Sequence, residues 1–385
     1  MKNLCEFITV NNAKKLQWKP IFFHCSTSDD LETLQALKSQ KSIIQVNDTI
    51  RDQLTSLLLN ENFNKHLSAD DINHEINKRY NNNPPEYYGV WIFYPWSNRL
   101  IHTLNKNEFI KIRTNRNLYK ISLLEQQVLA TKKVGIVGLS VGQSIALILA
   151  LERSIGQIRL ADFDTLEISN MNRLRSGLHN LGVPKVYIAA REIFEIDPYL
   201  DVICYPEGIT HNNINDFLLG NGKLDLLVDE CDSLEIKFEL RYQARNNKIP
   251  VIMDTSDRGL LDIERFDLEA NRPLFHGRIV ELSKETLIRM NPSEKLAAIL
   301  KIVNYNHISE RGRLSLNEIG KSLKTWPQIA SSVNLGGSIG ADTARRILLG
   351  EAVKSGRYYV DLNRIINSDL SFSNLNIPDA IKFLS

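Results

Sequence analysis

Residues 134–146 read VGIVGLSVGQSIA, an apolar strand-like run that enters a loop at Gly138 and continues into a helical pattern. Glycine at this point lets the chain turn sharply, and the helix that follows presents N–H groups that can bind a phosphate. The loop is a poor match to the G-x-G-x-x-G nucleotide-binding pattern, because only Gly138 and Gly142 remain as glycines and Ser140 lies between them. Taken alone, the stretch fits a structural strand-turn-helix unit equally well.

The alternation of strand and helix continues on the carboxyl side of this loop. Apolar runs typical of buried strands occupy 132–138, 157–164, 200–206, 224–230 and 250–255. Helical patterns lie among them, at 141–153, 184–196 and 234–247. This alternation predicts an α/β fold with a doubly wound, mostly parallel Rossmann-like sheet. Beyond about residue 270 the pattern becomes mixed, and it ends in a helix rich in small residues at 334–350.

The first 112 residues carry a different pattern, which we expect to form an N-terminal α/β accessory domain ahead of a main domain at 113–385. Expected strands lie at 19–25 and 42–46, and expected helices at 28–39, 50–59 and 68–80. A break rich in Asn, Pro and Gly follows at 81–89. The aromatic run after it, at 90–96, is interpreted as a buried strand or an interface element.

The composition excludes several classes of function. Lys and Arg number 47 against 45 Asp and Glu, so the net charge is only +2, which argues against a basic nucleic-acid-binding face. No apolar run approaches the roughly 18 residues that indicate a membrane span, and no secretory signal is recognisable. We therefore expect a cytoplasmic protein that binds neither nucleic acid nor membrane. The four cysteines form no C-x-x-C pair, which argues against a structural zinc site.

An acidic residue in the second strand-like run strengthens the nucleotide interpretation. Asp162 lies 24 residues after Gly138, at the end of that run, where an acid typically binds the two hydroxyls of a ribose. Its carboxylate would repel a 2′-phosphate, which leaves ATP or an NAD-type dinucleotide. The cations that follow, Arg173 and Lys185, favour ATP, because charge builds on the phosphate oxygens when a triphosphate is attacked at its α-phosphorus.

The residues around these cations resemble a known family. DFDTLEISNMNR (162–173) and LGVPK (181–185) resemble the signature of the ThiF, MoeB and ubiquitin-activating (E1-like) adenylating enzymes. DECDS (229–233), IRTNRN (112–117) and GGSIGADTARRILLG (336–350) resemble three further elements of that family, the last of them a terminal helix near the dimer interface.

The resemblance implies a nucleotide site. The loop residues Gly138, Ser140 and Gly142 would lie against ATP, and Asp162 would bind the ribose with Asp164 close by. The loop has fewer glycines than the family pattern, so the nucleotide geometry can differ in detail.

The resemblance also implies catalytic roles. Asn170 and Arg173 would contact the phosphates, and Lys185 would stabilise charge on the α-phosphate. Asp232 would bind Mg²⁺, and Arg116 would act in trans on the ATP of the partner subunit in a homodimer. One departure is Leu174, which replaces the glutamine that usually follows the family arginine.

The expected function is ATP- and Mg²⁺-dependent adenylation of a carboxylate on a peptide or small protein, with release of pyrophosphate. Because no cysteine occurs at 255–385, we expect direct nucleophilic attack on the acyl-adenylate without a thioester. The favoured role is modification of a ribosomally made precursor peptide in antibiotic biosynthesis, as in the microcin C and pantocin types, with the N-terminal domain binding the peptide.

Three alternatives remain open at this stage. The first is activation of a ubiquitin-like or sulfur-carrier protein. The second is an NAD-dependent oxidoreductase on the same sheet, which would have no use for Arg173 or Lys185. The third is a non-catalytic binding module on a degenerate Rossmann scaffold.

Overall fold

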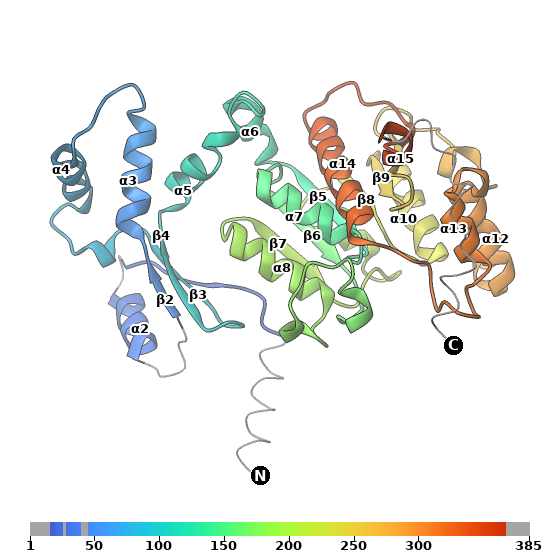
Figure 1. The fold of residues 1–385 in the computed structure, drawn as a ribbon, viewed down its shortest axis with the longest axis horizontal. Coiled ribbons are helices and arrows are strands. Elements are labelled where there is room, and N and C mark those ends of the chain that lie inside the picture. Colours follow the sequence, from blue (N-terminus) through green and yellow to red (C-terminus); the bar gives the residue numbers. More distant parts are fainter. Residues whose placement is uncertain (1–15, 26–27, 40–44, 367–385) are drawn as a thin grey trace, which may run out of the picture.

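A computed structural model describes residues 16–25, 28–39 and 45–366. The described chain contains two β-sheets, a smaller one built from residues 21–103 and a larger one built from residues 133–359. Figure 1 shows the smaller sheet with its helices at one side of the molecule and the larger sheet with its helices at the other.

The larger sheet has the doubly wound order that the alternation of strands and helices predicts. Its strands are β5 (Lys133–Val137), β6 (Gln157–Ala161), β7 (Asp201–Tyr205), β8 (Leu226–Asp229), β9 (Val251–Asp254), β10 (Leu260–Glu264) and β11 (Gly356–Tyr359). Their spatial order is β11-β10-β9-β8-β5-β6-β7, and the five from β9 to β7 are parallel. The chain reverses its direction of travel across the sheet between β5 and β8, and ligands of such sheets bind outside the carboxyl ends of strands at this point.

Helices cover both faces of this sheet and bury two separate apolar cores. On one face lie α7 (Gly142–Glu152), α8 (Lys185–Ile196) and α14 (Ala330–Leu348), and on the other lie α9 (Ile214–Leu219) and α10 (Leu234–Asn246). Successive strand residues point to opposite faces, so Ile136 belongs to the first core and Val137 to the second. The predicted strands and helices of this region are all present.

The sequence did not predict the antiparallel extension of the sheet by β10 and β11. The strand β10 is buried along its whole length although it carries two acids, Asp262 and Glu264. Glu264 accepts a hydrogen bond from Arg241 at 2.6 Å, and Asp262 contacts His276 at 2.8 Å. Buried charges are tolerated when they are paired in this way. The two acids nevertheless interrupt the apolar pattern, so the sequence alone does not indicate a buried strand here.

The small residues of α14 serve packing within the chain. A Cβ at Gly336 would lie 1.8 Å from the carboxylate of Asp254, and one at Gly337 would lie 2.1 Å from the hydroxyl of Ser144. The helix therefore packs closely on β9 at Gly336 and on α7 at Gly337. The other helices of this region are α11 (Lys284–Arg289), α12 (Pro292–Val303), α13 (Glu310–Leu316) and α15 (Leu362–Ile366).

The smaller sheet has the order β1-β3-β4-β2, in which β2 is parallel to β4 and the other neighbours are antiparallel. Its strands are β1 (Ile21–Phe23), β2 (Gln45–Asp48), β3 (Val90–Tyr94) and β4 (Arg99–Thr103). The helices of this part are α2 (Ser28–Ser39), α3 (Ile50–Glu61), α4 (Ala69–Tyr80) and α5 (Lys106–Arg113). The next helix, α6 (Leu123–Leu129), contributes Leu129 to the first core of the larger sheet. The predicted elements are confirmed, except that residues 42–44 of the second expected strand lie outside the described residues.

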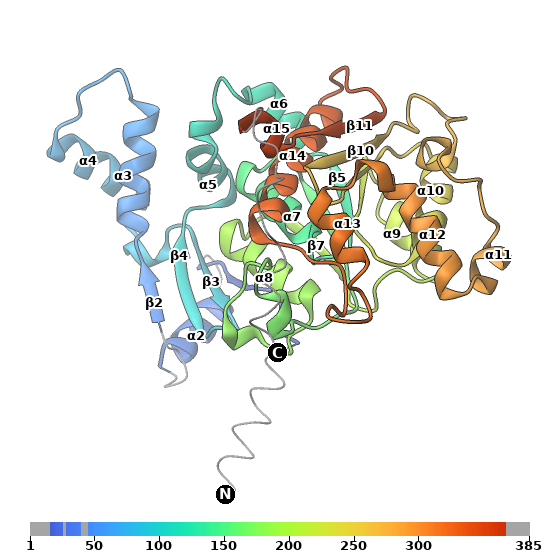
Figure 2. The same ribbon diagram turned by 45° about the vertical axis from the view of Figure 1, so that its right-hand side comes forward.

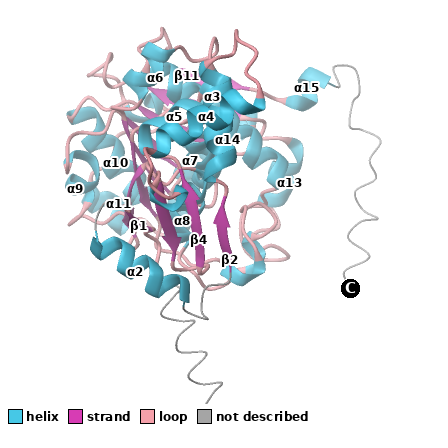
Figure 3. Ribbon diagram, turned by 90° about the vertical axis from the view of Figure 1, so that its left-hand side faces the viewer, coloured by secondary structure: helices cyan, strands magenta, loops and turns pink. Residues whose placement is uncertain are grey.

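The smaller sheet is anchored on α8, as Figures 2 and 3 show from two further directions. The hydroxyl of Tyr94 donates a buried hydrogen bond to the carbonyl of Phe194 at 3.0 Å, and the indole of Trp96 donates to Glu195 at 2.6 Å. The aromatic run at 90–96 is thus both a buried strand and an interface element. Among the described residues no helix is long and apolar enough to cross a bilayer.

Candidate active site

At two positions in the loop between β5 and α7 there is no room for any side chain, so only glycine fits. Gly138 has φ +87, and a Cβ there would lie 2.4 Å from the carbonyl oxygen of Glu230. A Cβ at Gly142 would lie 2.6 Å from the side chain of Ile136. These glycines therefore allow the tight turn and the close approach of helix to strand that a nucleotide loop uses. No side chain caps the N-terminus of α7 at Val141, so its first turn is open to an anion.

Asp162 follows β6 and braces this loop. One carboxylate oxygen accepts a hydrogen bond from the Leu139 N–H at 2.7 Å, and the other accepts one from the Asp164 N–H at 2.8 Å. Burial raises the pKa of Asp162 above its usual value, although the two backbone donors and Lys185 oppose this. A carboxylate can accept about four hydrogen bonds, so a ribose hydroxyl can still be accommodated. The ribose role of Asp162 stays a prediction.

Asp164 and Lys185 form an ion pair at the carboxyl end of β6. The ammonium of Lys185 lies 2.7 Å from the Asp164 carboxylate, and the backbone N–H of Lys185 also donates to the Asp164 carbonyl at 2.9 Å. The Lys185 side chain is only 7% exposed, whereas that of Asp164 is 52% exposed. The two ends of the loop between Asp164 and Lys185 therefore lie side by side. The ammonium of Lys185, the first residue of α8, is thereby held at the end of β6.

Arg173 lies beside the nucleotide loop and is held by neutral groups. Its Nε donates to the hydroxyl of Ser140 at 3.1 Å, and its Nη1 donates to the side-chain oxygen of Asn172 at 2.9 Å. Burial lowers the pKa of Arg173, and the nearby carboxylate of Asp232 opposes this change. The arginine therefore keeps a charge that a phosphate can neutralise.

Two residues of the same loop hold its shape. Asn170 accepts a hydrogen bond from the Glu167 N–H at 3.1 Å, which caps the short helix η3 (Ile168–Asn170). The phosphate role of Asn170 stays a prediction, since its amide oxygen already serves the backbone. Leu174, which departs from the family pattern, is buried in a small apolar cluster with Leu166 and Val183 beneath the loop.

Asp232 follows β8 and is exposed at the same edge of the sheet. Within the part of the chain that the structure describes, no side chain donates a hydrogen bond to its carboxylate. The described residues contain no group of three or more His, Cys, Asp or Glu that could hold a metal ion by themselves. In nucleotide sites Mg²⁺ is bound through one or two carboxylates together with the phosphates, and the metal role of Asp232 stays a prediction.

Arg116 is the one predicted site residue that the fold does not bring to this cluster. It is exposed in the short helix η2 (Asn115–Asn117), and no hydrogen bond or ion pair links it to another described residue. Its neighbour Arg113 has a structural role, because its guanidinium donates to the carbonyls of Ala150 and Leu151 at the end of α7.

Comparison with known proteins agrees with this geometry. The sequence profile of the ThiF family matches residues 113–355, more than half of the chain. The chain belongs to the ThiF family. It is 40% identical over 277 residues to the uncharacterized protein MT1398 of Mycobacterium tuberculosis (strain CDC 1551 / Oshkosh), an alignment that covers 72% of this chain. The chain spans only 38% of the length of that relative.

Two further similarities of the ThiF-family chain are more distant. It is 27% identical over 219 residues to the molybdopterin-synthase adenylyltransferase of Haemophilus influenzae, which covers 55% of this chain and 87% of that protein. The solved structure of Escherichia coli MccB with MccA-N7isoASN is 14% identical and has a TM-score of 0.46, with coverage of 80% of this chain and 86% of that one.

The ThiF-family chain has one site residue that sequence reasoning missed. Gln143, in the first turn of α7, donates hydrogen bonds to the carboxylate of Glu192 at 3.1 Å and to the carbonyl of Arg175 at 3.3 Å. From the sequence alone, the loop around it was recognised only as having fewer glycines than the family pattern. The structure shows that it connects the nucleotide loop to the middle of α8.

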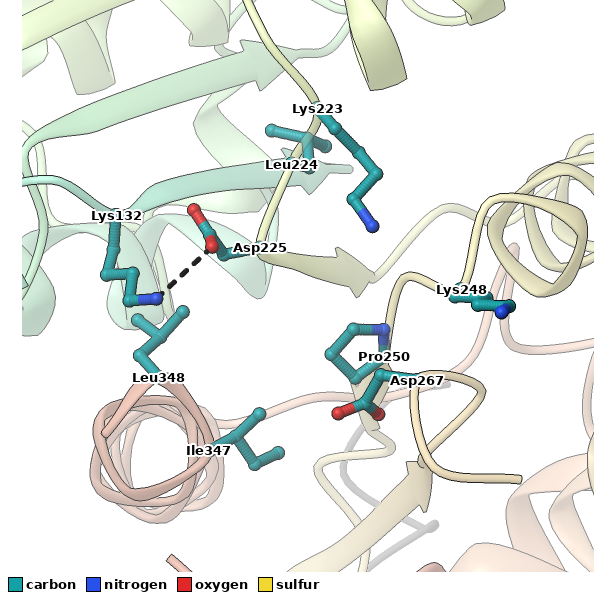
Figure 4. A pocket seen from close by; sticks show the side chains of 9 residues that line it. All are labelled: Lys132, Lys223, Leu224, Asp225, Lys248, Pro250, Asp267, Ile347 and Leu348. Carbon is teal, nitrogen blue, oxygen red and sulfur yellow. Dashed lines mark hydrogen bonds and ion pairs between the residues drawn. The ribbon is translucent and has the colours of Figure 1, made fainter. Parts of the chain in front are cut away.

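Two pockets of the ThiF-family chain differ in how close they lie to the candidate site residues. A small one of about 70 Å³ adjoins Ser140 and Arg173 and extends along α7 to Asn334 of α14. A pocket of about 200 Å³, drawn in Figure 4, lies beside Lys132 and Asp225, just before β5 and β8. That position is at the opposite edge of the sheet from the motif residues, and it is not the candidate site.

Proposed function

We propose that this chain is an ATP-dependent adenylyltransferase that activates a carboxylate on a peptide or small protein. The observation that supports this most strongly is the meeting of Arg173, Lys185 and Asp232 with the loop at Gly138, at the carboxyl ends of β5, β6 and β8. Cations and an exposed carboxylate beside an uncapped helix N-terminus form a site for a polyphosphate and its metal.

The proposed reaction is in-line displacement at the α-phosphorus of ATP. A carboxylate oxygen of the substrate forms a bond to that phosphorus as the bond to the bridging oxygen breaks, and pyrophosphate leaves. Negative charge grows on the α-phosphate oxygens and on the pyrophosphate, and Lys185 and Arg173 are placed to offset it. A nucleophile then attacks the acyl carbon and releases AMP.

Asp232 would bind Mg²⁺ together with the phosphates. When bound, the ion would neutralise part of the phosphate charge and orient the leaving group. The side chains keep their own tasks: Asp164 holds the Lys185 ammonium, and Ser140 holds the guanidinium of Arg173.

Direct attack on the acyl-adenylate is favoured over a cysteine relay. Burial strongly raises the pKa of Cys204, and burial together with the nearby Asp229 raises the pKa of Cys231 well above its usual value. Such thiols stay neutral near pH 7, and a neutral thiol is a poor nucleophile. No cysteine occurs at 255–385.

We also propose a homodimer in which Arg116 acts on the partner's ATP. Arg116 is exposed, and the segment that follows it exposes a run of large apolar side chains, Leu118, Tyr119, Leu123, Leu124 and Val128. Apolar side chains this close together indicate a surface that another protein covers. A second copy of the chain would bury them and carry the arginine with it.

For the biological role we favour modification of a ribosomally made precursor peptide in antibiotic biosynthesis. Residues 1–112 would form the accessory domain, which would help to hold the peptide beside the catalytic part at 113–385. The second candidate is activation of a sulfur-carrier or ubiquitin-like protein, which the Haemophilus influenzae relative favours by its name. An NAD-dependent oxidoreductase has no support from the family match.

The test is ATP–pyrophosphate exchange with candidate carboxylate substrates, combined with calorimetric titration of ATP and Mg²⁺. Arg173→Ala and Asp232→Ala should each reduce exchange about 10²–10³-fold, as when a donor to transition-state charge is removed. Arg364→Ala is the matched control, because this side chain is 76% exposed on α15 and should leave exchange unchanged. Exchange that survives both site substitutions would reject the proposal.

A further inference from the structure

A pocket lies between the smaller sheet and the catalytic part. Its volume is about 790 Å³. One wall is formed by Trp96 and Ser97 of the turn between β3 and β4 and by Arg99, the first residue of β4. The opposite wall is the loop at 177–183 together with the middle of α8. Known binding pockets for small ligands span about 300–1,000 Å³, so several amino-acid residues of a peptide would fit.

This pocket shares its wall with the candidate active site. The loop at 177–183 belongs to the segment that carries Arg173 at one end and Lys185 at the other. Glu192 lines the pocket and accepts a hydrogen bond from Gln143, which stands in the first turn of α7. A ligand in the pocket would therefore touch the same elements that form the phosphate site.

The acids of the pocket already have donors within the protein. Glu195 accepts a hydrogen bond from the indole of Trp96 at 2.6 Å, and Glu192 accepts one from Gln143 at 3.1 Å. Arg191 is also engaged, since its Nε donates to the carbonyl of Gln17 at 2.9 Å and its guanidinium lies over the Trp96 ring.

Two polar groups at the turn have no such partner. The guanidinium of Arg99 is exposed and makes no hydrogen bond or ion pair with any described residue. The hydroxyl of Ser97, two residues before it, is buried without a hydrogen-bond partner among the described residues. A buried hydroxyl left in this state is costly, and a guanidinium without a partner favours a carboxylate, which it can bind with two parallel hydrogen bonds. The pocket thus lacks an acceptor that its ligand would supply.

We propose that this pocket binds an acidic segment of the peptide substrate, with Arg99 paired to an Asp or Glu side chain. The bound segment is distinct from the carboxylate that is adenylated, and it would select the substrate and hold it beside the phosphate site. This inference rests on the proposed function for its choice of a peptide as the ligand.

The test uses a displayed library of random ten-residue peptides, selected on the full-length protein without ATP. We expect enrichment of Asp and Glu in the selected peptides, and we expect this enrichment to disappear with Arg99→Glu. Fluorescently labelled copies of the selected peptides should bind Arg99→Glu at least 10-fold more weakly than they bind the wild-type protein, as measured by fluorescence anisotropy. Arg99 is exposed, so the variant should fold; Lys301→Glu, a charge reversal on the exposed side of α12, is the control that should bind normally.

The site is checked by a photoreactive group on a selected peptide, which should crosslink to 96–99 or 177–183. Selection without acidic enrichment, binding that Arg99→Glu leaves intact, or crosslinks elsewhere would each overturn the proposal. The two proposals fail separately. Peptide selection without any ATP–pyrophosphate exchange would reject the adenylation, and exchange with peptides that do not need Arg99 would reject the acidic pocket.

Discussion

At the scale of single residues, the charged groups of the site differ in how the protein neutralises them. Lys185 is held by Asp164, whereas Arg173 is held by the neutral groups of Ser140 and Asn172. The resemblance of the sequence to the family pointed to all of these residues except Asn172, and the fold brings them together. The sequence could not predict that both carboxylate oxygens of Asp162 would accept hydrogen bonds from backbone N–H groups. These donors are positioned by the shape of the turns.

The ion pair between Asp164 and Lys185 should contribute measurably to stability. Asp164→Asn leaves a nearly buried ammonium without its counter-charge, so we expect the free energy of unfolding to fall by about 1–2 kcal/mol. This is less than the 3–5 kcal/mol typical of fully buried pairs, because the acid is half exposed. Adding Lys185→Met should restore most of the loss in urea denaturation.

The control for this double-mutant cycle is Asp232→Asn, which removes a carboxylate that has no hydrogen-bond donor among the described residues. Its unfolding free energy should change by less than about 0.5 kcal/mol. If Asp164→Asn behaves like this control, the ammonium of Lys185 is stabilised by something other than the ion pair.

At the scale of elements, periodicity predicted the parallel part of the larger sheet and its helices, because those strands are continuous apolar runs. It failed at β10, where Asp262 and Glu264 interrupt the apolar pattern and are neutralised by partners that come from elsewhere in the chain. It also could not show that the glycines of α14 pack against α7 and β9 in the same chain.

The loop before α7 should tolerate no side chain at its turning point. Gly138→Ala introduces strain at φ +87 and a Cβ only 2.4 Å from the Glu230 carbonyl, so we expect it to lower the free energy of unfolding by about 3 kcal/mol. Gly320 has a similar φ of +83 but nothing within 4 Å of its Cβ position. Gly320→Ala should therefore cost only about 1–2 kcal/mol.

Urea denaturation of both alanine variants separates backbone strain from the steric clash, since only Gly138→Ala suffers both. ATP titration of Gly138→Ala should also show weaker binding than wild type, because the displaced loop no longer faces the phosphates. Equal losses of stability in the two variants would mean that the loop relaxes and that the close contact with Glu230 is unimportant.

At the scale of the whole molecule, α8 joins the two sheets. Lys185 stands at its first residue, and the smaller sheet rests on its last turns through Tyr94 and Trp96. These contacts connect residues about one hundred positions apart in the chain, so no local pattern could predict them. A substrate held between the sheets would contact the helix that begins with Lys185, the proposed catalytic lysine. This is the physical reason to expect recognition and chemistry to be coupled.

The proposed homodimer gives the last prediction, which concerns two copies of the molecule. If Arg116 acts in trans, an Arg116→Ala chain paired with a Lys185→Ala chain contains one complete site, built from the lysine of the first chain and the arginine of the second. Random mixing should then restore about a quarter of the wild-type exchange rate, although each variant alone is nearly inactive. Leu124→Glu in both chains should abolish this recovery and yield monomers in sedimentation analysis, because it places a charge in the apolar surface. Mixed chains that stay inactive while sedimenting as dimers would place the arginine's action within its own subunit or remove it from the reaction.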